Sequence, residues 1–186
     1  GLIKGEKIES VLRLLTKNMT FKDLNIPLYA VAVDIERGKQ VVLEEGLVAE
    51  AVRASISIPG IFQPKRLNGK LLVDGAVLNR VPVELAREKG AQIVIAVDLK
   101  CDSSISKVKS IQNIFDVILT SLDLIEANSA IDYQIISDVL ISPKVAHIGI
   151  ADFNKAEECI ALGEEAAELA LPEIKKVLAS NILKSV

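Results

Sequence analysis

Two almost wholly apolar segments constrain the fold of this chain more than any other feature. Residues 26–35 read IPLYAVAVDI and residues 92–99 read QIVIAVDL. Apolar runs of this length without alternation are typical of strands that are buried on both faces, in a sheet covered by helices. Both runs are also far shorter than the roughly 18 residues expected of a membrane-spanning helix.

Segments with a helical period lie before, between and after these two strands. We therefore expect one α/β domain over residues 1–186, with a mainly parallel, helix-covered sheet. The predicted helices are 5–16, 47–57, 82–90, 107–136 and a C-terminal helix from about Asn154, kinked or interrupted at Pro172. The other predicted strands are 39–45, 65–67, 70–73 and 138–142, with hairpins over 26–43 and around Asn68-Gly69.

The composition excludes two classes of protein. Half of the residues are apolar, the mean hydropathy is +0.37, and 22 Lys and Arg face 25 Asp and Glu, for a net charge of −3. A disordered chain has low hydrophobicity and high net charge, and a nucleic-acid-binding protein has a basic excess, so neither class fits. Cys101 and Cys159 form no C-x-x-C motif, which indicates free thiols in a reducing, cytoplasmic compartment.

Several common catalytic motifs are absent from the sequence. There is no G-x-G, no G-x-S-x-G and no H-x-x-x-H, so a dinucleotide loop, a serine elbow and a paired-histidine metal site are not encoded. His147 is the only histidine and is interpreted as a loop or packing residue. Ser55 and Ser57 end a predicted helix, where serine hydroxyls usually bond to nearby backbone.

Asp74 is the candidate catalytic residue that the local sequence indicates. It follows the apolar run LLV and precedes two small residues, Gly75 and Ala76, which allow another chain or a ligand to approach closely. Ligands of open α/β sheets collect at the carboxyl ends of strands. Asp-Gly is also a common turn, so the dipeptide alone leaves a catalytic role and a turn role open.

Three longer motifs occur in order around this aspartate. They are ASISIPGIFQP at 54–64, NGKLLVDGAVLNRVP at 68–82 and GAQIVIAVDL at 90–99. Together they resemble the C-terminal half of the patatin-like phospholipase family. That half carries an A-S-x-x-x-P-x-x-F-x-P stretch, a short hairpin, an Asp-Gly-Gly/Ala motif with N-x-x-P, and a "GA…viaVd" strand. The ending ADFNKAEECIALGEEAA also looks like the small bacterial and archaeal members.

The resemblance implies a Ser-Asp dyad that works without histidine. In the family the serine lies in a G-x-S-x-G elbow and a glycine-rich loop supplies the oxyanion donors, both in the N-terminal half. Asp74 matches the dyad aspartate, and Gly75 and Ala76 complete its motif. Because both upstream motifs are missing and the chain opens on Gly1 instead of Met, we expect it to be the C-terminal portion of the domain, inactive alone.

The implied function is hydrolysis of acyl esters, such as phospholipids or lysophospholipids, by a patatin-like serine hydrolase of lipid metabolism. Its partners would be the substrate and the N-terminal half that carries the serine; a transient membrane surface and a second copy of the chain stay open. The dyad requires no cofactor and no metal. An acyltransferase would pair serine with histidine, and His147 fits no such motif. The main alternative is a non-catalytic interaction or regulatory module that retains the fold.

Overall fold

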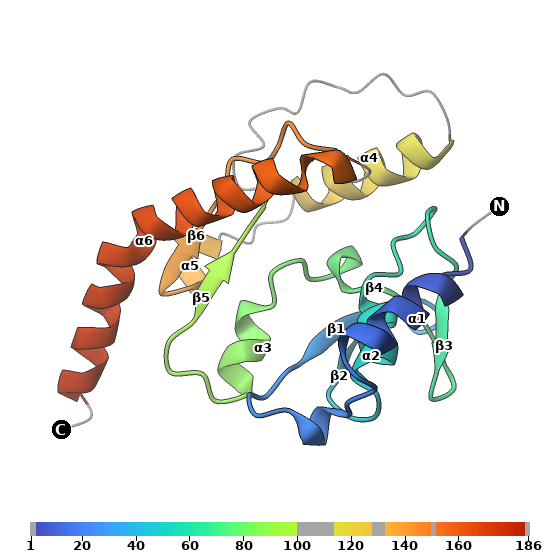
Figure 1. Ribbon diagram of the computed structural model, residues 1–186, viewed down its shortest axis with the longest axis horizontal. Helices are drawn as coiled ribbons and strands as arrows, with labels where there is room; N and C mark the ends of the chain where they lie inside the picture. The colour runs from blue at the N-terminus through green and yellow to red at the C-terminus, as the bar shows by residue number, and fades with distance from the viewer. Residues whose placement is uncertain (1–2, 100–113, 128–132, 150–151, 185–186) are drawn as a thin grey trace. The chain divides into compact units, whose positions relative to one another are not determined.

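The computed structural model describes residues 3–99, 114–127, 133–149 and 152–184 (Figure 1). The chain divides into two units. Among the described residues, the first unit comprises 3–80 and 114–127, and the second comprises 81–99, 133–149 and 152–184.

The first unit is built on a four-stranded sheet with the strand order β2-β1-β4-β3. All three pairings are antiparallel. Asn68 and Gly69 join the last two strands with φ angles of 50° and 73°, the positive values that a two-residue hairpin turn requires. The strands are β1 (Ala30–Asp34), β2 (Lys39–Leu43), β3 (Lys65–Leu67) and β4 (Lys70–Asp74).

The expectation of a mainly parallel sheet is therefore wrong. Residues 35–38 and 68–69 connect neighbouring strands directly, and a link this short can only reverse the chain, whereas parallel strands need a crossover of a dozen or more residues. Burial is confirmed for residues 31–33 of the first apolar run, each less than a tenth exposed, whereas Ile26 and Ile35 near its ends are exposed. The second apolar run is not buried on both faces, since Ile95 and Val97 are exposed. The mixed α/β character of the chain is also confirmed.

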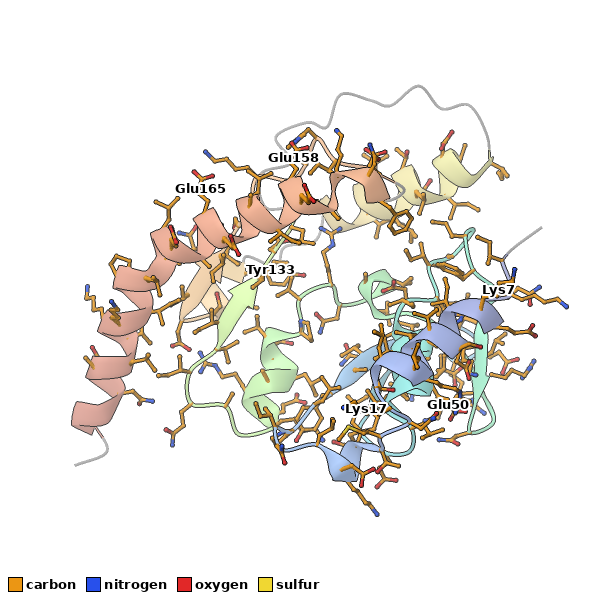
Figure 2. All side chains as sticks on the ribbon, viewed as in Figure 1. Lys7, Lys17, Glu50, Tyr133, Glu158 and Glu165 are labelled. Atoms are coloured by element: carbon orange, nitrogen blue, oxygen red, sulfur yellow. The ribbon has the colours of Figure 1, made fainter. Side chains whose placement is uncertain are left out.

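Two helices cover this sheet in succession. Helix α2 (Val48–Ser55) packs against β1, β3 and β4, and α1 (Glu6–Leu15) packs on α2. Arg13 of α1 donates to Glu50 of α2 at 2.8 Å; Figure 2 labels Glu50 beside α1. Small alanines let α2 approach the strands closely. The buried core consists of Phe21, Ala32, Leu43, Val48, Ala51, Ala54 and Leu72.

The described parts of the predicted long helix at 107–136 are helical. They form α4 (Ile114–Ala127) and the short α5 (Tyr133–Ile136). Residues 107–113 and 128–132 of that prediction lie outside the described residues.

In the second unit, β5 (Ile95–Val97) pairs in parallel with β6 (Val139–Ile141). Helices α3 (Val83–Glu88) and α5 contact each other, and α6 (Ala156–Lys184) contacts β6. The apolar cluster of this unit is Val81, Val83, Val94 and Ala96, with Tyr133, Ile136 and Leu140 packed against it (Figure 2 labels Tyr133).

Helix α6 continues through Pro172, so of the two predicted effects, a kink or an interruption, the interruption is wrong. Pro172 has no N–H to donate to the carbonyl of Glu168, and because Glu168 is exposed, water can bond to that carbonyl instead. Figure 1 shows the helix axis changing direction along its length. Although α6 has 29 residues, neither it nor any other described helix is long and apolar enough to cross a membrane.

A polar cluster anchors the parallel strands at their starting ends. Asp138 Oδ2 accepts hydrogen bonds from Val94 N at 2.7 Å and from Arg87 Nη2 at 2.5 Å. Arg87 Nη1 also donates to the carbonyl of Gln92 at 2.8 Å. The bond from Val94 N, followed by the contribution of Arg87, holds the pKa of Asp138 below its usual range. This carboxylate therefore helps to align β5 with β6.

Asp138→Ala should lower the free energy of unfolding by about 1–2 kcal/mol, because Val94 N and Arg87 lose their acceptor. The pKa of Asp138 is lowered by folding, so its contribution is present above the unfolded pKa and is lost as the pH falls through the folded pKa. Urea unfolding at pH 7 and at acidic pH measures both effects. The control is Glu165→Ala, at an exposed α6 position (Figure 2), with an expected change within about 0.5 kcal/mol. An equal loss in both variants would contradict the prediction.

Candidate functional site

Asp74 is the last residue of β4, and its backbone is held on two sides. It lies opposite Ala32 of β1 in the antiparallel register. Its N–H donates to the carbonyl of Ser57, just after α2, at 3.0 Å. The position of Asp74 therefore depends on the central strand pair and on the end of the covering helix.

The Asp74 carboxylate caps the turn that follows it. Oδ1 accepts from Ala76 N at 2.8 Å, at the start of the short 3₁₀ helix η2 (Gly75–Val77). Burial raises the pKa of Asp74 above its usual value, and the bond from Ala76 N counteracts part of this effect. Among the residues that the structure describes, no cation forms a salt bridge with this carboxylate. A half-buried carboxyl group with a raised pKa and one oxygen without a bond from these residues is a candidate base.

Gly75 is required by a close approach of two backbones. A Cβ atom at this position would lie 2.5 Å from the carbonyl oxygen of Val31 and 3.0 Å from its Cγ1. No side chain fits there without moving β1. Ala76, by contrast, is exposed. The small residue after Asp74 thus lets η2 lie directly against the central strand.

The two helix-end serines are engaged in structural bonds, as the sequence predicts. Ser55 Oγ donates to the carbonyl of Val31 at 2.8 Å. Ser57 is fully buried, and its Oγ donates to the carbonyl of Arg53 at 2.9 Å while accepting from Arg53 Nη1 at 2.6 Å. Neither hydroxyl is presented as an exposed nucleophile.

His147 belongs to the second unit and is exposed. Its Nε2 lies 2.7 Å from Glu158 Oε1 on α6, and this bond lowers the pKa of Glu158 (Figure 2 labels Glu158). Cys159 carries a free thiol, and Cys101 lies outside the described residues. Within the described ranges, no three His, Cys, Asp or Glu residues gather in the way a metal ligand set does.

Sequence reasoning missed Arg53, which is only 2% exposed. It lies on the face of α2 that also buries Ala49, four residues earlier, so a charged residue on an otherwise apolar helix face was the available signal. An arginine at such a position must find hydrogen-bond partners inside the protein.

The pKa of Asp74 can be compared with those of two other aspartates. We expect Asp74 to titrate above the ordinary aspartate range, and Asp34 and Asp138 below it, because burial dominates at Asp74 and hydrogen bonds dominate at the others. Carboxyl chemical shifts of ¹³C-labelled aspartate against pH measure all three. Titration of Asp74 at or below the ordinary value would contradict the assignment.

The same shift has a consequence for stability. Since folding raises the pKa of Asp74, its ionisation favours the unfolded chain, and the associated stability is lost as the pH rises through the folded pKa. Asp74→Asn retains an oxygen that can accept from Ala76 N. At pH 7 this variant should be at least as stable as the wild type in urea unfolding; a clear loss of stability would contradict the prediction.

Gly75→Ala should lower the free energy of unfolding by about 1–3 kcal/mol, because its Cβ would overlap the Val31 carbonyl. Gly163→Ala is the matched control. Nothing lies within 4 Å of its added Cβ, and alanine in a helix should stabilise the chain by about 0.5–1 kcal/mol. Urea unfolding of both variants tests the difference in sign, which a neutral Gly75→Ala would contradict.

The sequence of this chain is similar to a protein-family model and to several known proteins. Residues 1–87 match the model of the patatin-like phospholipase family. An NTE family protein of Mycobacterium tuberculosis is 37% identical over 99 residues, covering 53% of this chain and 28% of that protein. A second NTE family protein of the same species is 26% identical over 193 residues, covering 92% of this chain and 33% of its own.

A mammalian protein is similar over a comparable stretch. Patatin-like phospholipase domain-containing protein 7 of Rattus norvegicus is 33% identical over 101 residues, covering 53% of this chain and 8% of that protein. The chain thus spans about a third or less of the length of the curated relatives it matches. The resemblance to the patatin-like phospholipase family is confirmed for residues 1–87, the segment that contains Asp74, Gly75 and Ala76.

Proposed function

We propose that this chain is the C-terminal portion of a patatin-like domain in a serine acyl hydrolase that acts on phospholipid, lysophospholipid or related acyl esters. One observation carries the proposal. Asp74, inside the segment that matches the family, ends a buried strand as a half-buried carboxylate with a raised pKa and one oxygen without a bond from the described residues. The names of the family and of the rat relative support the lipid substrate class.

In the proposed reaction, Asp74 moves protons between three oxygen atoms. A serine hydroxyl, supplied by the N-terminal half, attacks the acyl carbonyl and passes its proton to the carboxylate. The tetrahedral intermediate collapses to an acyl-enzyme, and the leaving alcohol takes the proton from Asp74. Water then attacks the acyl-enzyme and gives a proton to Asp74, and that proton returns to the serine as the fatty acid leaves.

The surroundings of Asp74 suit this role. A base works best when its pKa approaches the working pH, and burial moves the pKa of Asp74 in that direction. The bond from Ala76 N holds Oδ1 and leaves Oδ2 for the serine. Gly75, pressed against Val31, restricts movement of the turn that carries this donor.

The proposed N-terminal partner gains support from β5. Ile95, Val97 and Leu99 are 42%, 51% and 56% exposed, whereas Ala96 between them is buried. Parallel strands are normally covered on both faces, so we expect a cover over this apolar face, which the N-terminal half or another part of this chain could supply. A second copy of the chain is the alternative cover.

We also propose a cytoplasmic location, supported by the free thiol of Cys159, and contact with a membrane surface only during turnover.

The test uses the protein together with its upstream sequence. A fluorophosphonate probe should label one serine, and Asp74→Asn should lower kcat for ester hydrolysis by about a thousandfold, the range of a lost general base. The control is Asp23→Asn, which changes an exposed aspartate bonded to Thr20 and should leave the rate within about twofold. Full activity in Asp74→Asn would overturn the proposal.

The hydrogen bond from Ala76 N to Asp74 Oδ1 favours a second candidate function, that of a non-catalytic module. Because Ala76 N and the tight fit of Gly75 account for the local structure without any reaction, a non-catalytic module would also retain them. Translation of the codons upstream of Gly1 separates the two. A G-x-S-x-G motif there supports the hydrolase, and its absence supports an interaction or regulatory module.

A further inference from the structure

Arg53 is a buried cation whose bonds reach three separate segments. Nη1 donates to Ser57 Oγ at 2.6 Å, and Nη2 donates to the carbonyls of Lys4 at 2.9 Å and Gln63 at 3.1 Å. The guanidinium also lies 5.2 Å from the centre of the Phe62 ring. Its partners are thus the end of α2, the segment before α1 and the segment before β3.

These partners are all neutral. Across the described ranges, Arg53 forms no salt bridge with a carboxylate. Glu9 interacts electrostatically with this cation without forming a salt bridge, so hydrogen bonds to neutral acceptors hold the buried charge in place. The planar guanidinium directs donors on separate nitrogens to acceptors from several segments in fixed directions, whereas the three donors of lysine share one nitrogen. These contacts indicate that Arg53 holds three segments of the chain together through hydrogen bonds.

The segment before α1, residues 3–5, contacts the guanidinium of Arg53. Ile3 N donates to the carbonyl of Ile61 at 2.9 Å, and Gln63 N donates to the carbonyl of Ile3 at 2.9 Å, which makes a short parallel bridge. Gly5 has a φ angle of +78°, and a Cβ there would lie 2.2 Å from Arg53 Nε. Residues 3–5 therefore follow a path that the arginine shapes.

Ser57 connects the same arginine to Asp74. Its hydroxyl is held by Arg53 from both the side chain and the backbone, and its carbonyl accepts from Asp74 N at 3.0 Å. Two consecutive hydrogen-bonded links thus join the guanidinium to the backbone of the candidate base.

We propose that Arg53 is a positioning residue, which sets the path of the chain entering at residue 3 relative to Asp74. The inference rests on the proposed function, in which that entering chain carries the nucleophilic serine. A misplacement of about 1 Å between reacting groups can lower a rate by about a hundredfold. A rigid link between the entry segment and the base would therefore control the rate without contacting the substrate.

The first test needs no activity. Arg53→Met keeps an apolar stem beside Phe62 and removes the guanidinium. In this chain, amide hydrogen exchange at Gln63 and Asp74 should become at least about tenfold faster, while amides in the β1–β2 pair keep their rates. The matched control is Arg66→Met, at a surface position 69% exposed, which should change none of these amides. Wild-type exchange at Gln63 and Asp74, or equal acceleration everywhere, would overturn the proposal.

The second test uses the whole enzyme. Arg53→Met should lower kcat at least about tenfold, with KM within about twofold, at a temperature where the variant remains folded. Arg53→Lys retains the charge but only one nitrogen, so it should show an intermediate loss. A lysine variant with full kcat would overturn the positioning role. If Asp74→Asn proves fully active, the proposed hydrolase fails, and the exchange result still decides whether Arg53 joins these segments.

A variant that loses the arginine could fail to fold. Ser57→Ala then takes its place, because it removes only the hydroxyl between Arg53 and the Asp74 link. Its exchange should accelerate at Asp74 more than at Gln63, whose segment Nη2 still holds. Equal effects at both amides would overturn the link through Ser57.

Discussion

The antiparallel pairing of β4 with β1 is the constraint on which the candidate site depends. It places Asp74 beside Ala32 and brings the backbone of Gly75 so close to Val31 that no side chain fits between them. The same pair forms the floor on which α2 packs, with Ala32 and Leu72 in its core. The carboxylate is thus presented at the end of the most buried part of the unit.

The environments of three aspartates show how burial and partners set different pKa values for one residue type. Asp34 ends β1 and is bonded to Arg37, so its pKa falls. Asp138 accepts from Val94 N and Arg87, with the same result. Asp74 ends β4 with a single backbone donor and no salt bridge among the described residues, so burial dominates and its pKa rises. This difference distinguishes a candidate base from carboxylates that stabilise structure.

The sequence pattern predicted many local features correctly and the arrangement of the main sheet incorrectly. Asn68-Gly69 marked a real hairpin, because both residues adopt positive φ. The apolar run at β1 indicated a strand buried on both faces, but such burial does not distinguish parallel from antiparallel neighbours. Asp34 ends β1 and Asp74 ends β4, and because these strands are antiparallel, their carboxyl ends lie at opposite edges of the sheet. The rule that ligands collect where the strands end therefore does not bring these two carboxylates into one site.

By itself, the sequence determined the strand and helix segments, the Asp-Gly-Ala turn after an apolar strand, and the motifs that resemble the patatin-like phospholipase family. These are local, because backbone preferences and residue order suffice to specify them. Only the tertiary structure decided that Gly75 must lack a side chain, that burial raises the pKa of Asp74, and that Arg53 joins residues 4, 57 and 63. Each of these depends on atoms brought together from distant parts of the chain, and their distances are set by packing.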